Sequence, residues 1–144
     1  MLSKLKIIIA TSLHAKILLL DEPTSGLDVI ARNEVLDLLR DYMEQNEEAS
    51  ILISSHISSD LEGLCDEFYF IEKGKIILCE QDLESYALLK GVYETVDLSY
   101  ALKKIGSTYL TNERQFYVEN YSNLVIEKAH IDDLMEYMIK GETI

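Results

Sequence analysis

The stretch ILLLDEPTSGLD, residues 17–28, decides how the first part of this chain is interpreted. Four aliphatic residues lead directly into two adjacent carboxylates, Asp21 and Glu22, and then into a proline and a small polar turn. The continuous aliphatic run favours a strand over residues 16–20 that is buried on both faces of a parallel sheet. Such a strand delivers its last residues to the carboxyl edge of the sheet, where α/β proteins bind their ligands. We therefore expect Asp21 and Glu22 to lie at a ligand-binding edge.

The segments around this strand predict an alternation of helices and strands. Apolar residues at helical spacing indicate helices over 2–14 and 29–45, the second with Asp28 as its N-cap. A second aliphatic strand is expected over 50–54, followed by a short helix from Ser58 to Cys65 that is capped by Ser58 or Ser59. This order implies an α/β fold in which right-handed crossovers connect parallel strands.

Residues 67–82 predict a hairpin, because two β-rich runs flank a turn that contains Gly74. We expect Asp82 to cap a short helix that continues to about Leu89. Beyond Gly91 the composition changes and tyrosines become frequent, so a domain boundary is expected near residue 90.

Two kinds of element are expected in the last part of the chain. The stretch TYLTNERQFYVENYSN, residues 108–123, predicts two short strands of one antiparallel pair. Residues 131–140 predict an amphipathic helix that is closed by Gly141. The expected organisation is one domain over 1–90 and a small α+β extension over 91–144.

Composition excludes several classes of protein. The chain has 144 residues, of which 48% are hydrophobic and 27% charged, as in an ordinary globular domain. Its net charge of −13 disfavours nonspecific binding to nucleic acid or to anionic lipid. Two cysteines, Cys65 and Cys79, have no metal-ligand spacing, so we interpret them as small core thiols in a reducing cytoplasm. The apolar runs are shorter than the ~20 residues that a membrane-spanning helix needs.

The carboxylate pair suits nucleotide chemistry. An aspartate at a strand end can hold Mg²⁺ on a bound nucleotide, and a second carboxylate can orient or deprotonate the attacking water. The full run ILLLDEPTSGLD resembles the Walker B motif and D-loop of ABC-type ATPases. The segment ILISSH, residues 51–56, resembles the switch strand of that family, which ends in the H-loop histidine, here His56. The hairpin segment that follows is also similar, with Asp66 and Gly74 in the expected places, so the resemblance covers residues 17–80.

The resemblance implies roles for individual residues. Asp21 would hold Mg²⁺ through water, Glu22 would be the general base, and His56 would contact the γ-phosphate of ATP and the attacking water. Ser25, Gly26 and Asp28 would form the nucleotide-binding D-loop, with Asp28 facing a partner subunit. The alternatives are a solvated strand end for the two carboxylates and a capping or core histidine. His14 and His130 match no motif and are interpreted as surface residues.

Other motifs of the family do not occur in the sequence. The only Gly-Lys pair, Gly74-Lys75, is followed by Ile76 and lacks the earlier glycine of the P-loop pattern G-x-x-x-x-G-K-[ST]. No Q-loop glutamine precedes Walker B, and no two glycines are adjacent as in the LSGGQ signature. The expected fold is therefore a partial P-loop NTPase (ABC ATPase) core with parallel strands and crossover helices, plus the C-terminal extension.

The expected function is that of a truncated ATP-binding and ATP-hydrolysing subunit of a bacterial ABC transporter. The ending EYMIKGE is similar to the tails of export-type subunits. Without a P-loop the chain alone is expected to bind Mg²⁺-ATP weakly and not to hydrolyse it. It would act at the cytoplasmic face of a membrane with a separate permease, would self-associate, and would not bind nucleic acid.

Two other interpretations of the chain are open. The first is a catalytically dead interaction module, or degenerate remnant, that keeps the fold for dimerisation. The second is a DNA-repair or chromosome-structure ATPase lobe, which is disfavoured because the chain has no heptad run.

Overall fold

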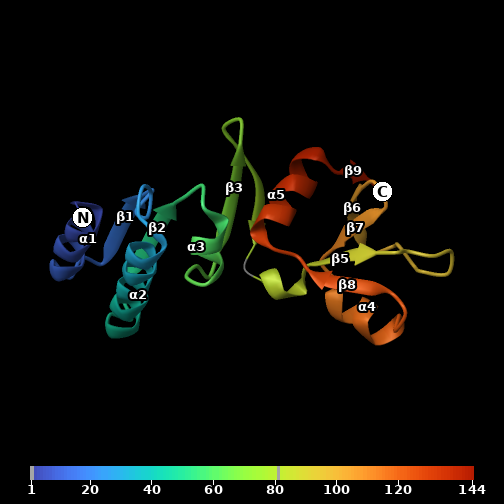
Figure 1. The fold of residues 1–144 in the computed structure, drawn as a ribbon, viewed down its shortest axis with the longest axis horizontal. Coiled ribbons are helices and arrows are strands. Elements are labelled where there is room, and N and C mark those ends of the chain that lie inside the picture. Colours follow the sequence, from blue (N-terminus) through green and yellow to red (C-terminus); the bar gives the residue numbers. More distant parts are fainter. Residues whose placement is uncertain (1, 81) are drawn as a thin grey trace. The chain divides into compact units, whose positions relative to one another are not determined.

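The computed structural model describes residues 2–80 and 82–144, which divide into two compact units, Met1–Leu64 and Cys65–Ile144. Figure 1 shows both units and labels most of their helices and strands. Each unit is described by itself below. The division into a core over 1–90 and an extension over 91–144 stays a prediction about domain organisation.

The first unit alternates helices and strands as predicted. Its elements, in chain order, are α1 (Leu2–Ser12), β1 (Ile17–Asp21), α2 (Val29–Gln45), β2 (Ser50–Ser54) and α3 (Ser58–Glu62). β1 pairs with β2 in parallel, in a register that runs from Ile17 opposite Ser50 to Asp21 opposite Ser54. Both strands therefore end at the same edge, and the segments that follow them begin there.

The starts of α2 and α3 differ in their capping. Asp28 caps α2 as predicted, because its Oδ1 accepts a hydrogen bond of 2.9 Å from the backbone N–H of Ala31. The predicted serine cap of α3 is wrong. Ile57 occupies the N-cap position without a side-chain bond, and the Ser55 hydroxyl accepts the Ile57 N–H instead. The helix is also shorter than predicted and ends at Glu62.

Only one face of the β1–β2 pair is covered. On that face the aliphatic side chains of both strands pack with Ile7 of α1 and with Val35 and Leu39 of α2. On the other face Ile17, Leu19 and Leu52 are 67%, 73% and 64% exposed. The expectation of a strand buried on both faces is therefore wrong, because α1 and α2 contribute to the covered face and no described element covers the other.

The second unit begins with the predicted hairpin. β3 (Phe68–Glu72) and β4 (Lys75–Glu80) pair antiparallel. Lys73 and Gly74 in the turn both have positive φ, 49° and 76°, which is the backbone of a two-residue primed turn. The interpretation of Cys79 as a core thiol lies outside the side chains that the structure describes.

A five-stranded sheet forms the rest of the second unit, in the order β8-β5-β7-β6-β9. All of its neighbouring strands pair antiparallel. Its elements are the 3₁₀ turn η1 (Leu83–Ser85), β5 (Ala87–Lys90), β6 (Ala101–Ile105), β7 (Thr108–Thr111), α4 (Arg114–Asn120), β8 (Val125–Lys128), α5 (Ile131–Lys140) and β9 (Glu142–Thr143). The first four strands have the 4-1-3-2 order of a ferredoxin-like sheet, with the connection over residues 91–100 in place of the first crossover helix.

Two predictions for this unit are wrong. The helix expected after Asp82 is one 3₁₀ turn, which Asp82 does cap, and residues 87–90 are the strand β5. Ala87, Leu88 and Leu89 are all buried, so this short run has no periodicity that separates a strand from a helix. The second strand expected within 108–123 is the helix α4, whose Tyr117 is fully buried.

Both faces of the five-stranded sheet are covered. Leu89 and Tyr109 lie opposite each other on one face and pack with Tyr117 of α4. Leu88 and Leu110 lie opposite each other on the other face. The α5 side chain of Tyr137 hydrogen-bonds to Thr108, which shares that second face. None of the helices in the described part of the chain is long and apolar enough to cross a membrane.

Candidate functional site

Two strand ends meet at the edge where the candidate site lies. Asp21 ends β1 and Ser54 ends β2, directly opposite it. The Ser54 hydroxyl donates a hydrogen bond to Oδ1 of Asp21. The backbone N–H of Glu22 donates to the Ser54 carbonyl at 2.9 Å, so the strand pairing extends by one residue. Ser54 therefore fixes both the carboxylate of Asp21 and the backbone of Glu22.

Glu22 and His56 face each other across this edge. Oε2 of Glu22 lies 2.7 Å from Nδ1 of His56. The Glu22 side chain is 34% exposed and the His56 side chain 69% exposed, so water reaches both. A carboxylate can only accept, so Nδ1–H of His56 donates to Glu22 and leaves Nε2 as an acceptor in the neutral ring.

The backbone at Glu22 is in the left-handed region, with φ of 47°. This backbone conformation costs free energy for a residue other than glycine, so it persists only where the surrounding structure holds it. The β1–β2 pairing holds Glu22 on one side through Ser54. On the other side the turn begins at once, because the N–H of Ser25 donates to the Glu22 carbonyl at 3.1 Å.

The turn over residues 22–28 places the remaining predicted site residues. Ser25, Gly26 and Asp28 are exposed. Gly26 has φ of 72°, which favours glycine at this position. The Asp28 carboxylate caps α2. The structure thus brings Asp21, Glu22 and His56 together, whereas Ser25, Gly26 and Asp28 lie along the turn that leads away from them.

Four residues that were not predicted as site residues support this edge. Ser54 holds Asp21, as described above. Behind the turn, the buried carboxylate of Asp60 accepts a hydrogen bond of 2.6 Å from the Thr24 hydroxyl and one of 3.3 Å from Nη1 of Arg32. The strand register could have identified Ser54, because Ser54 ends the second strand as Asp21 ends the first. No sequence signal joined Thr24, Arg32 and Asp60, which lie on three different segments.

The oxygen atoms at the edge fit a Mg²⁺ ion that is held through water. The Asp21 carboxylate and the Ser54 hydroxyl are hard oxygen groups, which suit this ion. Among the described residues no group of three or more His, Cys, Asp or Glu could hold a metal by itself. Mg²⁺ usually keeps several waters and binds through one or two carboxylates together with substrate phosphates, so this ligand set fits Mg²⁺ that arrives with a nucleotide.

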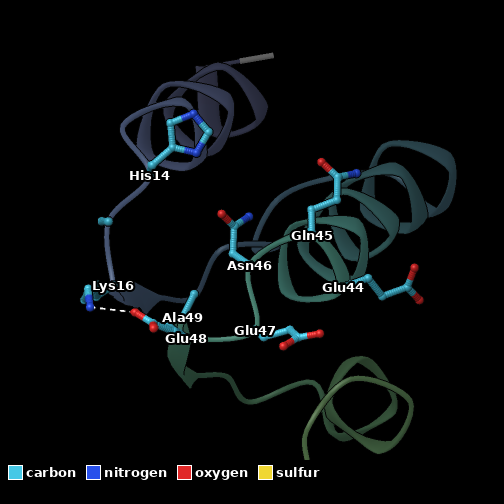
Figure 2. A pocket seen from close by; sticks show the side chains of 9 residues that line it. His14, Lys16, Glu44, Gln45, Asn46, Glu47, Glu48 and Ala49 are labelled. Atoms are coloured by element: carbon cyan, nitrogen blue, oxygen red, sulfur yellow. Dashed lines mark hydrogen bonds and ion pairs between the residues drawn. The ribbon is translucent and has the colours of Figure 1, made fainter.

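The predicted surface residue His14 lies elsewhere, at an open depression (Figure 2). The depression is formed by the segments 14–16 and 44–49, which precede β1 and β2, so it lies at the other end of the strand pair. Its lining includes Glu44, Glu47 and Glu48, and Lys16 pairs with Glu48 at 2.7 Å. It contains none of the predicted site residues.

No family model matches the sequence. The chain is 28% identical, over 117 residues, to the ABC transporter ATP-binding protein YtrB of Bacillus subtilis, covering 79% of this chain and 39% of YtrB. It is 44% identical, over 78 residues, to the lantibiotic transport ATP-binding protein SrtF of Streptococcus pyogenes, covering 54% of this chain and 33% of SrtF. It is 35% identical, over 80 residues, to the mouse phospholipid-transporting ATPase ABCA3, covering 56% of this chain and 4% of ABCA3.

The chain thus spans less than two-fifths of the length of each of these relatives. The similarity agrees with the motifs read from the sequence. Over about half to four-fifths of its length its homologues are ABC transporter ATP-binding proteins, which is consistent with a partial ABC-type ATPase.

Proposed function

We propose that this chain is part of an ATP-hydrolysing subunit of a bacterial, export-type ABC transporter. The residues at the ends of its strands β1 and β2 would carry out the hydrolysis. The observation that carries the proposal is the contact of 2.7 Å between Glu22 Oε2 and His56 Nδ1 at the edge where Asp21 ends β1. A carboxylate within reach of water, oriented by an imidazole and next to a second carboxylate, can activate a water for phosphoryl transfer.

Each of the three side chains has its own role in the proposed reaction. Glu22 accepts the proton of the attacking water, because its carboxylate is partly exposed and already oriented. His56 holds the Glu22 carboxylate through Nδ1–H and, in the neutral ring, offers Nε2 as an acceptor to the attacking water. Asp21, held by Ser54, would hold Mg²⁺ through water. Bound Mg²⁺ would neutralise charge on the phosphates of ATP.

The chain alone does not hydrolyse ATP in this proposal. Its sequence has no P-loop, whose backbone amides and lysine would position the phosphates. Phosphoryl transfer depends almost entirely on positioning and electrostatics, so Glu22 and His56 cannot replace those contacts. The chain would work at the cytoplasmic face of a membrane together with a permease and with P-loop and signature motifs from another source.

Two observations support the export-type, bacterial assignment. The C-terminal sequence EYMIKGE is similar to the tails of such subunits. The relative SrtF is named as a lantibiotic transport protein, and both SrtF and YtrB are bacterial. The exposed residues Ser25 and Gly26 of the turn are available to a facing subunit, as the D-loop interpretation requires.

A second candidate function is a catalytically inactive interaction module. The uncovered apolar side chains of Ile17, Leu19 and Leu52 favour it, because a face of this kind recruits another polypeptide. Self-association through this face is compatible with both functions. Only hydrolysis distinguishes them.

Nucleotide binding by the isolated chain tests the first part of the proposal. We expect calorimetric titration with Mg²⁺-ATP to give a Kd of about 1 mM or weaker. Micromolar affinity that is lost in Asp21→Ala would contradict the proposal. Such affinity requires a phosphate-binding site, and the sequence has no P-loop to supply one.

Complementation tests the second part. The chain is fused behind the P-loop and signature half of a related subunit, and ATP hydrolysis is compared with that of the two parts alone. We expect hydrolysis only from the fused protein. A fused protein that binds ATP tightly but does not hydrolyse it would favour the interaction module.

A further inference from the structure

A buried carboxylate outside the predicted motifs joins the two segments that carry Glu22 and His56. Asp60 is only 4% exposed, and Thr24 is 2% exposed. Oδ2 of Asp60 accepts the Thr24 hydroxyl at 2.6 Å, and Oδ1 accepts Nη1 of Arg32 at 3.3 Å. Each carboxylate oxygen therefore has a donor, as a buried charge requires.

The three residues come from different segments of the first unit. Thr24 lies two residues after Glu22 in the turn, and Arg32 lies in the first turns of α2. Asp60 lies four residues after His56, in α3. The carboxylate thus connects the segment that follows Glu22 to the segment that follows His56.

The position of α3 depends on this connection. α3 has five residues and no side-chain bond at its N-cap, so it cannot be stable as an isolated helix. If α3 moved away from the turn, the Asp60 carboxylate would lose the hydrogen bonds from Thr24 and Arg32. The Asp60 contacts therefore hold α3, and with it the preceding segment 55–57, against the turn.

The Glu22–His56 contact lies between two tethers. The first is the strand pairing, which ends with the hydrogen bond from the Glu22 N–H to the Ser54 carbonyl. The second is the Thr24–Asp60 hydrogen bond. The His56 side chain is largely exposed, so packing does not fix its ring and its position follows that of the backbone on either side.

We propose that Asp60 is a positioning residue, which through Thr24 and Arg32 holds His56 within hydrogen-bonding distance of Glu22. Its importance for catalysis rests on the function proposed above. The positioning of His56 by Asp60 does not rest on the proposed function, because it concerns only contacts within this chain.

Side-chain ¹⁵N NMR of the histidines tests the proposal without nucleotide. The full chain is labelled with ¹⁵N-histidine and measured near pH 8, where an unperturbed imidazole is neutral. His56→Gln assigns the His56 signals, and His14 and His130 serve as internal references. We expect wild-type His56 to show the shifts of a fixed Nδ1–H tautomer. Glu22→Ala, which removes the acceptor, gives the reference for the lost contact.

Thr24→Val and Thr24→Ser are the deciding pair of variants. Thr24→Val keeps the shape of the side chain and removes the hydroxyl, so we expect His56 to lose the fixed-tautomer shifts and to resemble Glu22→Ala. Thr24→Ser keeps the hydroxyl and should retain the wild-type shifts. Asp60→Asn keeps the size of the side chain but removes the charge that Arg32 pairs with, and should behave as Thr24→Val does.

The circular dichroism spectrum and the His14 signals report whether each variant is folded. Wild-type His56 shifts in a folded Thr24→Val protein would overturn the proposal. So would an equal loss of the shifts in Thr24→Val and Thr24→Ser, because the effect would then not depend on the hydroxyl. If Asp60→Asn does not fold, the two Thr24 variants decide. Failure of the fused protein to hydrolyse ATP would count against the proposed function and leave this result unchanged.

Discussion

The β1–β2 pair of the first unit and the five-stranded sheet of the second unit differ in how completely they are covered. In Cys65–Ile144 a five-stranded sheet has a helix on each face, and Leu89, Leu110 and Leu134 are fully buried. In Met1–Leu64 the two longer helices pack on one face of a two-stranded pair, and the aliphatic residues of the other face remain exposed. The candidate site therefore lies at the edge of a strand pair that is covered on one face only.

This difference shows that apolar strand residues are buried within the chain in one sheet and left exposed in the other. In the five-stranded sheet, apolar residues on both faces, such as Leu89 and Leu110, are buried by other parts of the second unit. In the first unit, the strand before Asp21 has the composition of a strand covered on both faces but has cover on only one. The exposed side chains thus point to association with further polypeptide, and the packed unit provides a control for each test.

The largest expected effect is on the oligomeric state. Burying the exposed side chains of Ile17, Leu19 and Leu52 contributes about 1.5–3 kcal/mol each, which association costs offset only in part. We expect the purified chain to self-associate at micromolar concentration, as measured by light scattering. Leu19→Glu should shift it to the monomer, because a charge on this face opposes burial.

The matched control for this variant is Ile30→Glu. Ile30 is as exposed as Leu19, at 74% against 73%, but lies on α2 and not on the uncovered strand face. The Ile30→Glu variant should leave the self-association of the chain unchanged. A wild-type chain that stays monomeric and folded would remove the association claim and would mean that the exposed face is tolerated in water.

The next effect is on stability and compares one leucine from each unit. Leu110→Ala in β7 removes a fully buried side chain, so we expect the free energy of unfolding to fall by about 2–5 kcal/mol. Leu19→Ala in β1 should change it by no more than about 0.5 kcal/mol, because that side chain is mostly exposed. Urea denaturation followed by circular dichroism, below the concentration at which the chain associates, gives both values. Equal losses would show that the uncovered face is packed in solution.

A smaller effect concerns pH and tests the packing of the second unit. The Tyr117 hydroxyl donates to the Asp97 carbonyl at 2.7 Å, and burial raises the pKa of Tyr117 from 10.0 to about 12. Because the folded unit favours the protonated phenol, its contribution to stability is present below pH 10 and is lost as the pH rises from 10 to 12. The free energy of unfolding should fall by up to about 1.4 kcal/mol per pH unit in this range.

Tyr117→Phe isolates this contribution from the other tyrosines of the chain. The variant loses a hydrogen bond, worth about 1 kcal/mol at neutral pH, but has no phenol to titrate at this position. The difference in Tm between wild type and Tyr117→Phe should therefore shrink as the pH rises above 10. A difference that is constant with pH would indicate that the Tyr117 phenol is not shielded from water.

The first unit could be predicted from sequence to a greater extent than the second. The helix with its Asp28 cap and both strands before the predicted site follow from periodicity and local capping chemistry, and all are present. In the second unit the Gly74 hairpin and the helix over 131–140 are also present as predicted. The five-stranded sheet was missed because β5, which lies between β8 and β7, is a short apolar run buried on both faces. The aromatic residues around Tyr117 suggested a strand, but packing against the sheet makes that segment a helix.

The candidate site was predictable only in part. Asp21 and Glu22 could be placed from the end of a strand, and the parallel register then brings the segment of His56 to the same edge. The contact between Glu22 and His56 depends on side-chain directions that spacing does not determine. The buried contacts of Asp60 depend on the fold of α3, and nothing in the sequence separates this aspartate from the many exposed acids of the chain.

The most direct test of the account is ATP hydrolysis by the fused protein with Glu22→Gln. This change removes the carboxylate that accepts the proton of the attacking water and keeps the size of the side chain, so it should affect the chemical step alone. We predict that hydrolysis falls by at least ~100-fold while ATP binding stays at the wild-type level, and that His56→Ala impairs turnover with binding likewise retained. Hydrolysis by Glu22→Gln near the wild-type rate would contradict the central claim, because the base would then lie elsewhere.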